Sequence, residues 1–269
     1  MGRARIAYDN LCRREELPAT ITAGSSASGA PPERILSEDL TEYWQSAYGV
    51  GSTWIEIDLH ATELIDLVCL PNTSARPGST WRVVIAIGDT QTPANVTFDS
   101  GTVSGNIIDP YGTFIMFLAA AVLGSRIRIY VTDPSVNISD PDHNCLEIPR
   151  SWIAKAFLPT RNFNLDYQET SEDLSKKSRS EAGSWSINKG PILRGLNLTF
   201  STMPEADRLE VRRLKRIVGS SMEVLVCQND ASTRLQEEAF VALPVLHPTT
   251  GHPQSGVISQ WTLEVMEMV

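Results

Sequence analysis

The chain has 269 residues, of which 23 are basic and 32 acidic, giving a net charge of -9 and a pI near 5.0. This length allows one large β domain or two domains of ordinary size, and we expect two. The negative charge, without a compensating basic stripe, excludes sequence-specific nucleic-acid binding, and the longest apolar run, residues 114–124, is too short for membrane insertion.

Short segments with alternating apolar and polar residues dominate the first half of the chain. "TWIEIDL" (53–59), "TWRVVIAIG" (80–88) and "SRIRIYVTD" (125–133) each place one set of side chains inward and the other outward. Polar loops rich in Gly, Pro, Ser and Asn separate them. We therefore predict a mainly β protein whose N-terminal domain, residues 1–158, is a jelly-roll β-sandwich.

The character of the sequence changes after Pro159. Residues 166–183 are highly charged and are interpreted as an extended arm, and alternating strands then resume. Residues 159–269 are predicted to form a β-barrel or sandwich with one α-helix. That helix is expected to begin at a capping box of Thr202 and Glu205 and to end at Gly219.

The sequence contains no recognisable catalytic or metal-binding motif. Nucleophile elbows, phosphate-binding loops and zinc motifs are missing, so we expect no catalytic residue, no metal site, no cofactor and no enzyme activity. The cysteines are expected to be free buried thiols, with a bridge from Cys12 to Cys145 as the alternative. Trp44 and Trp54 could pack in the core or, on an exposed loop, stack on a sugar.

The stretch from Pro31 to Asn72 resembles the galactose-binding-like β-sandwich of discoidin and coagulation-factor F5/8 type C domains. The resemblance covers roughly residues 5–158 and rests on Asp39, Trp44, Trp54, Ile57, Asp58, Leu59, Ile65 and Val68. It implies structural roles for Trp44, Trp54 and Asp58. Ligand binding would fall to loops 24–33 and 72–80, where Asn72, Ser74 and Arg76 are the candidate ligand residues.

The second half of the chain resembles the distal tail or tail-tube proteins of long-tailed bacteriophages. A strand, a helix bounded by Pro204 and Gly219, and a following apolar strand carry this resemblance. It implies a structural protein of the virion tail tip or baseplate, assembled in the host cytoplasm.

Such a protein would form a ring with copies of itself around the tail axis, as a hexamer rather than a trimer. It would also contact the tail tube, the hub and receptor-binding proteins. The alternative function is a carbohydrate-binding module for host surface glycans, and a third is a glycan hydrolase with an accessory sandwich.

Overall fold

The computed structural model describes residues 2–37, 39, 41–108, 112–164, 167–179, 185–219, 221–245, 249–254 and 258–268. The chain forms two compact units. Unit 1 contains residues 1–8, 157–229 and 240–269, and unit 2 contains residues 9–156 and 230–239. The predicted division near residue 158 lies close to the observed one, but the first eight residues belong with the C-terminal half.

Unit 2 is built around one seven-stranded antiparallel sheet with the order β10-β4-β8-β5-β6, in which β2 also pairs with β4 and β7 with β5. Its elements are β2 (Thr20–Ala23), β3 (Trp44–Gln45), β4 (Ser52–Leu70), β5 (Thr80–Ala86), β6 (Val96–Asp99), β7 (Val103–Ser104), β8 (Phe114–Thr132), β9 (Glu147–Ile148) and β10 (Trp152–Ala154), with the short helix α2 (Leu235–Glu238) and the 3-10 turns η1 (Leu11–Arg13), η2 (Pro32–Leu36) and η3 (Pro93–Asn95). The small pair β3 and β9 forms a separate two-stranded sheet.

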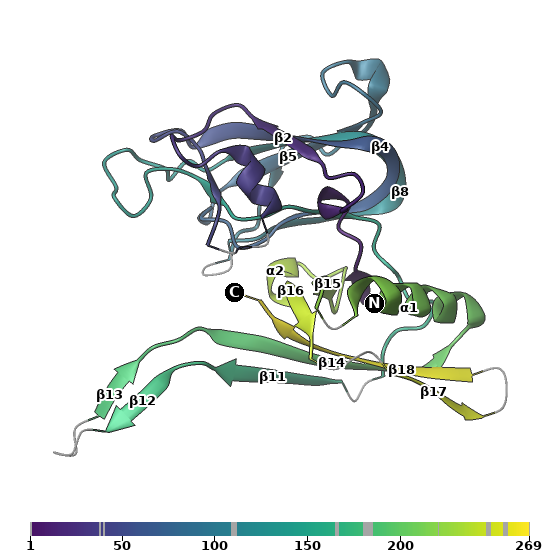
Figure 1. Cartoon of the computed structure of the whole chain (residues 1–269). Helices are drawn as coiled ribbons and strands as arrows, with labels where there is room; N and C mark the ends of the chain where they lie inside the picture. Colours follow the sequence, from purple (N-terminus) through teal and green to yellow (C-terminus); the bar gives the residue numbers. More distant parts are fainter. Residues whose placement is uncertain are drawn as a thin grey trace. The chain divides into compact units, whose positions relative to one another are not determined.

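The long strands β4 and β8 run side by side and curve together, so their two halves contribute to facing layers (Figure 1). The register between them shifts between Asp58 and Glu63, at the bend. Close packing there requires Gly124, because a Cβ at this position would lie 2.2 Å from Cγ2 of Ile85. The sandwich expected from the alternating segments is thus produced largely by one bent hairpin.

The core of unit 2 lies between these layers. The inward residues predicted from alternation, including Ile55, Ile57, Ile127 and Ile129, are buried there. The end of the predicted 80–88 strand differs, because β5 stops at Ala86 and Ile87 is exposed. The apolar run 114–124 forms the first part of β8.

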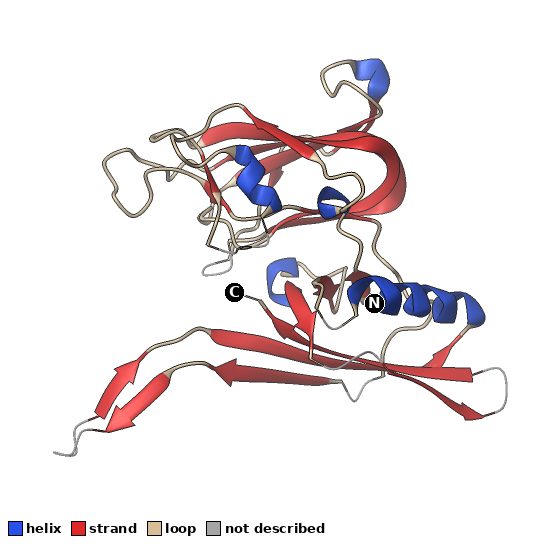
Figure 2. Ribbon diagram, viewed as in Figure 1, coloured by secondary structure: helices blue, strands red, loops and turns tan. Residues whose placement is uncertain are grey.

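Unit 1 contains a second seven-stranded sheet, with the order β1-β15-β16-β18-β14-β11 and β17 paired with β18 (Figure 2). Its elements are β1 (Arg5–Ala7), β11 (Gln168–Asp173), β12 (Lys176–Arg179), β13 (Trp185–Asn188), β14 (Ile192–Met203), helix α1 (Glu205–Val218), β15 (Val224–Cys227), β16 (Ala239–Pro244), β17 (Thr249–Gln254) and β18 (Ile258–Glu267). The N-terminal strand β1 pairs antiparallel with β15, which explains why residues 1–8 belong to this unit.

Helix α1 packs its apolar side on the core of unit 1. Val211, Leu214 and Val218 are buried with strand residues such as Leu198 and Trp261, as the helical periodicity predicts.

The predicted capping box is wrong: Thr202 lies in β14, and Pro204 occupies the N-cap position without a side-chain cap. Thr202 instead accepts a hydrogen bond from Arg161, and Glu205 pairs with Arg208. Gly219 ends the helix with a φ of 55°, as predicted.

A long two-stranded arm extends the sheet of unit 1. Strands β11 and β14 pair along residues 168–173 and 192–197, and β12 and β13 continue the ribbon beyond them (Figure 1). The predicted arm at 166–183 therefore corresponds to paired strands, although residues 166 and 180–183 lie outside the described residues.

All four cysteines are buried and free, which confirms the expectation of thiols and excludes the Cys12 to Cys145 bridge. Burial raises the pKa of the Cys12 thiol to about 11.

Among the helices of the described residues, none has the length and apolar character needed to traverse a bilayer.

Candidate functional site

The outward face of the unit 2 sheet carries ordered rows of side chains across β4, β8 and β5. The pairing places Ser52, Thr132 and Thr80 in one row, and Trp54, Tyr130 and Arg82 in the next. Because strand residues alternate between faces, the inward isoleucines of these strands leave this face to hydroxyl, aromatic and charged groups.

A pocket of about 260 Å³ lies where β4 and β5 begin and β8 ends. Most of its lining side chains carry a hydroxyl group. The lining residues are Ser52, Thr53, Trp54, Thr80, Trp81, Arg82, Thr102, Tyr130 and Thr132.

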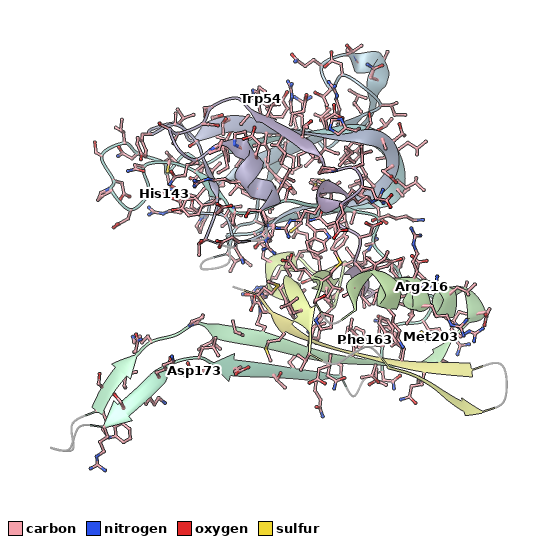
Figure 3. All side chains as sticks on the ribbon, viewed as in Figure 1. Trp54, His143, Phe163, Asp173, Met203 and Arg216 are labelled. Carbon is pink, nitrogen blue, oxygen red and sulfur yellow. The ribbon has the colours of Figure 1, made fainter. Side chains whose placement is uncertain are left out.

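The two tryptophans of the pocket have different roles. Trp81 is almost fully buried and packs on Phe114 at 5.3 Å between ring centroids, so it belongs to the core. Trp54 is only partly buried and lies on the outer side of unit 2 (Figure 3). The guanidinium of Arg128 stacks over the Trp54 ring at 4.3 Å and fixes its orientation.

The arginines around the pocket are paired with carboxylates. Arg82 binds Asp99 through two hydrogen bonds of 2.9 and 2.6 Å, which raises the pKa of Arg82 and lowers that of Asp99. Arg128 donates to Glu56 at 2.7 Å. Burial disfavours the charged form of Arg128, but hydrogen bonding to Tyr130 and the charge of Glu56 outweigh it and raise the pKa of Arg128. The pocket therefore presents balanced charges and many hydroxyl groups, a surface suited to a neutral polar ligand.

The predicted ligand loop 72–80 is held by internal contacts. The Ser74 hydroxyl accepts a hydrogen bond from the Glu147 amide at 2.8 Å, and the Arg76 amide donates to Asp133 at 2.9 Å. The Arg76 side chain is exposed, and its guanidinium lies 3.4 Å from the Asp140 carboxylate. Asn72 is exposed, with a φ of 54°. Among the described contacts, none joins Asn72, Ser74 and Arg76 to one another, so their ligand role stays a prediction.

Asp133 is the central acceptor behind this loop. It accepts hydrogen bonds from the Arg76 amide, from the amide and hydroxyl of Ser135, and from Nε2 of His143 at 3.0 Å. Burial would raise the pKa of Asp133, but these hydrogen bonds outweigh it and lower the pKa. The cluster fixes the loops 71–80 and 133–144 to each other, which is a structural role.

The remaining residues predicted to be structural in unit 2 have clear partners. Trp44 is fully buried, and its indole N–H donates to the Ser26 hydroxyl at 2.9 Å. Asp58 pairs with Arg126 at 2.8 Å on the outward face. Within the described ranges, no three His, Cys, Asp or Glu side chains are grouped so that they could hold a metal ion.

No known family model and no curated protein sequence matches the chain. Several solved structures are similar over 55% of it. The chitosan-binding module 1 of a Paenibacillus sp. chitosanase/glucanase is 22% identical, is covered over 99% of its length and gives a TM-score of 0.41.

A Streptococcus pneumoniae fucose-binding module is 13% identical to this chain, which spans 98% of the module's length with a TM-score of 0.38. A Ruminococcus gnavus GH29 fucosidase is 17% identical with a TM-score of 0.40, and this chain spans 27% of its length. The similar structures thus include carbohydrate-binding modules.

Proposed function

We propose that unit 2 binds a carbohydrate without altering it chemically, and that the ligand occupies the pocket beside Trp54. The observation that carries this proposal is the pocket itself, whose lining combines the partly buried Trp54 ring with many hydroxyl groups. Modules named for binding chitosan and fucose are among the similar structures.

Sugars combine hydroxyl groups with an apolar face of C–H groups. The hydroxyls of Ser52, Thr80 and Thr132 can donate and accept hydrogen bonds, and Trp54 offers apolar aromatic surface beside them. Because Arg82 and Arg128 are already paired with carboxylates, the pocket favours a neutral saccharide over an acidic one.

Glycan-array binding of the full chain tests this proposal. We expect Trp54→Ala to weaken binding about tenfold, because the variant removes the aromatic contact. Tyr48→Ala is the matched control, since Tyr48 is an exposed aromatic residue that does not line the pocket. Absence of binding to any glycan, or turnover of a polysaccharide panel by the wild-type chain, would contradict the proposal.

The same glycan array shows whether the ligand binds in the pocket or at the predicted ligand loop 72–80. Arg76→Ala changes an exposed side chain of loop 72–80 and leaves the pocket lining intact. If Arg76→Ala abolishes binding while Trp54→Ala does not, the ligand site is the loop and the pocket assignment is wrong.

A second candidate function is the structural role in a bacteriophage tail tip that the sequence resemblance implies. The arm of unit 1 favours it, because its strands β13 and β14 expose Trp185, Ile187 and Ile192 to solvent. Trp185 is 65% exposed, which is unusual for such a large apolar side chain. Apolar residues on a projecting ribbon are a feature of contacts with another copy or another protein.

Native mass spectrometry of the full chain, together with electron microscopy of phage particles, tests this second function. A closed ring, expected to contain six copies, and labelling at the tail tip would support it. A chain that stays monomeric and is missing from particles would contradict it, whatever the outcome of the glycan array.

A further inference from the structure

The outer edge of the arm carries its charges in two separate blocks. The block on β11 is acidic, and the block on β12, which follows directly along the chain, is basic. All six side chains are exposed. The acidic residues are Glu169, Glu172 and Asp173, and the basic residues are Lys176, Lys177 and Arg179.

The backbone of this edge is available for further pairing. Within the described part of the chain, β11 pairs with β14 alone, on one side. The Leu174 amide donates inward to the Pro191 carbonyl at 3.0 Å. Because alternate residues of an antiparallel ladder direct their amides and carbonyls to opposite sides, Glu169, Ser171 and Asp173 present theirs outward. An edge of this kind is a template for another strand.

We propose that two copies of this chain associate through the β11–β12 edge, antiparallel and about a two-fold axis. In an antiparallel pair, the acidic half of one edge faces the basic half of the other, and the reverse holds at the far end. A parallel pair would instead place like charges opposite each other, which is destabilising. The edge is therefore complementary to itself only in the isologous arrangement.

The charge blocks also select a register centred on Leu174. This register places Glu172 opposite Lys176 of the second copy and Glu169 opposite its Arg179. Leu174 then meets Leu174 on the axis, and its side chain is 43% exposed in the single chain. Since the Leu174 amide points inward, the two leucines form a non-hydrogen-bonded pair, the type in which Cα atoms are closest, at about 4.5 Å.

Charge reversal tests the arrangement. One variant carries Glu169→Lys and Glu172→Lys, and the other carries Lys176→Glu and Arg179→Glu. Each alone places like charges opposite each other, so we expect the dimer to weaken about tenfold or more in sedimentation velocity. A mixture of the two variants restores opposite charges at all of these pairs and is expected to form a heterodimer.

A cysteine at the axis tests the register. Leu174→Cys places two thiols within the range for a disulfide, so mild oxidation should give a covalent dimer. The native cysteines are all buried, and Ile187→Cys on the other strand of the tip is the matched control, which should stay monomeric under the same oxidation.

The outcomes decide the proposal independently of glycan binding, because all these variants lie in unit 1 and the pocket lies in unit 2. A strictly monomeric wild-type chain overturns the two-fold contact. So does an oligomer that both charge-reversed variants retain, or a Leu174→Cys variant that crosslinks no better than Ile187→Cys.

Discussion

Asp133 shows how a single buried carboxylate can hold two loops in place. It is 1% exposed and accepts hydrogen bonds from Arg76, Ser135 and His143, each of which belongs to one of the loops that it joins. A buried carboxylate is stable only with such partners, because its charge would otherwise be poorly solvated. The loops 71–80 and 133–144 therefore depend on its ionised form.

We expect Asp133→Asn to lower the free energy of unfolding by about 3 kcal/mol, because an amide cannot accept all of these hydrogen bonds. Urea denaturation measures the change. Asp140→Asn is the control, since Asp140 lies in the same loop but is partly exposed and its pairing with Arg76 is long, at 3.4 Å. Equal losses in the two variants would contradict the role given to Asp133.

The pH dependence of stability follows from the same residue. The pKa of Asp133 is lowered in the folded chain, so its contribution is present above the usual value of 3.8 and is lost as the pH falls through the lower, folded value. Thermal unfolding from pH 6 downward should therefore show a steeper acid loss in the wild-type chain than in Asp133→Asn. The same slope in both would exclude this explanation.

The sequence can predict a residue's role when that role depends on its neighbours in the chain, but not when it depends on a distant partner. The resemblance implied a structural role for Trp54, but the structure has its ring only partly buried on the outward face, opposite Ile55 and Ile57. The alternation of these isoleucines is the local signal that could have indicated this orientation. The role of Ser74 could not be predicted, because its partner Glu147 is distant in sequence. Turn-rich loops can thus be located from composition, but the internal contacts that occupy their side chains cannot be predicted from it.

Helix α1 was the most predictable element of the chain. Its apolar spacing and its terminal glycine are local signals, and both are present in the structure. The capping box failed because Thr202 is needed in β14, which runs on to Met203 and leaves Pro204 as the N-cap. Strand pairing therefore overrode a local helix signal.

At the scale of this element, we expect Leu214→Ala to destabilise unit 1 by about 2 to 5 kcal/mol, because it leaves a cavity beneath the helix. Leu214 is fully buried in the unit 1 core. Leu209→Ala on the same helix is the control, since Leu209 is 54% exposed and should change stability by less than about 0.5 kcal/mol. Thermal melts of both variants would show a clear difference, and similar melts would mean that α1 does not cover the core.

For the whole molecule, the main feature is that most of unit 2, residues 9–156, is inserted between two segments of unit 1. The chain leaves unit 1 after Tyr8 and returns at Phe157, and these two points are close because Ile6 and Phe157 exchange backbone hydrogen bonds of 3.0 and 2.8 Å. The sequence did not reveal this arrangement, because a three-residue strand such as β1 carries too little pattern to indicate its partner.

We expect unit 1 to fold without most of the sandwich. A chain in which residues 10–155 are replaced by a short glycine linker keeps β1 beside Phe157, so it should unfold cooperatively in a thermal melt. Deletion of residues 1–8 from the same chain is the comparison, and it should lower stability because β15 loses its only partner on that side within the described sheet. An unfolded linker chain would show that unit 1 depends on the insertion.

The pairing of β1 with β15 also sets an order of events during synthesis. The partner of Arg5 is Cys227, which follows the inserted sandwich in the sequence and is therefore synthesised well after Arg5. The bent hairpin of β4 and β8 is complete long before then, so the inserted sandwich can collapse around its core while translation continues. Strand β1 therefore cannot pair with β15 until both strands of the bent hairpin have already been synthesised.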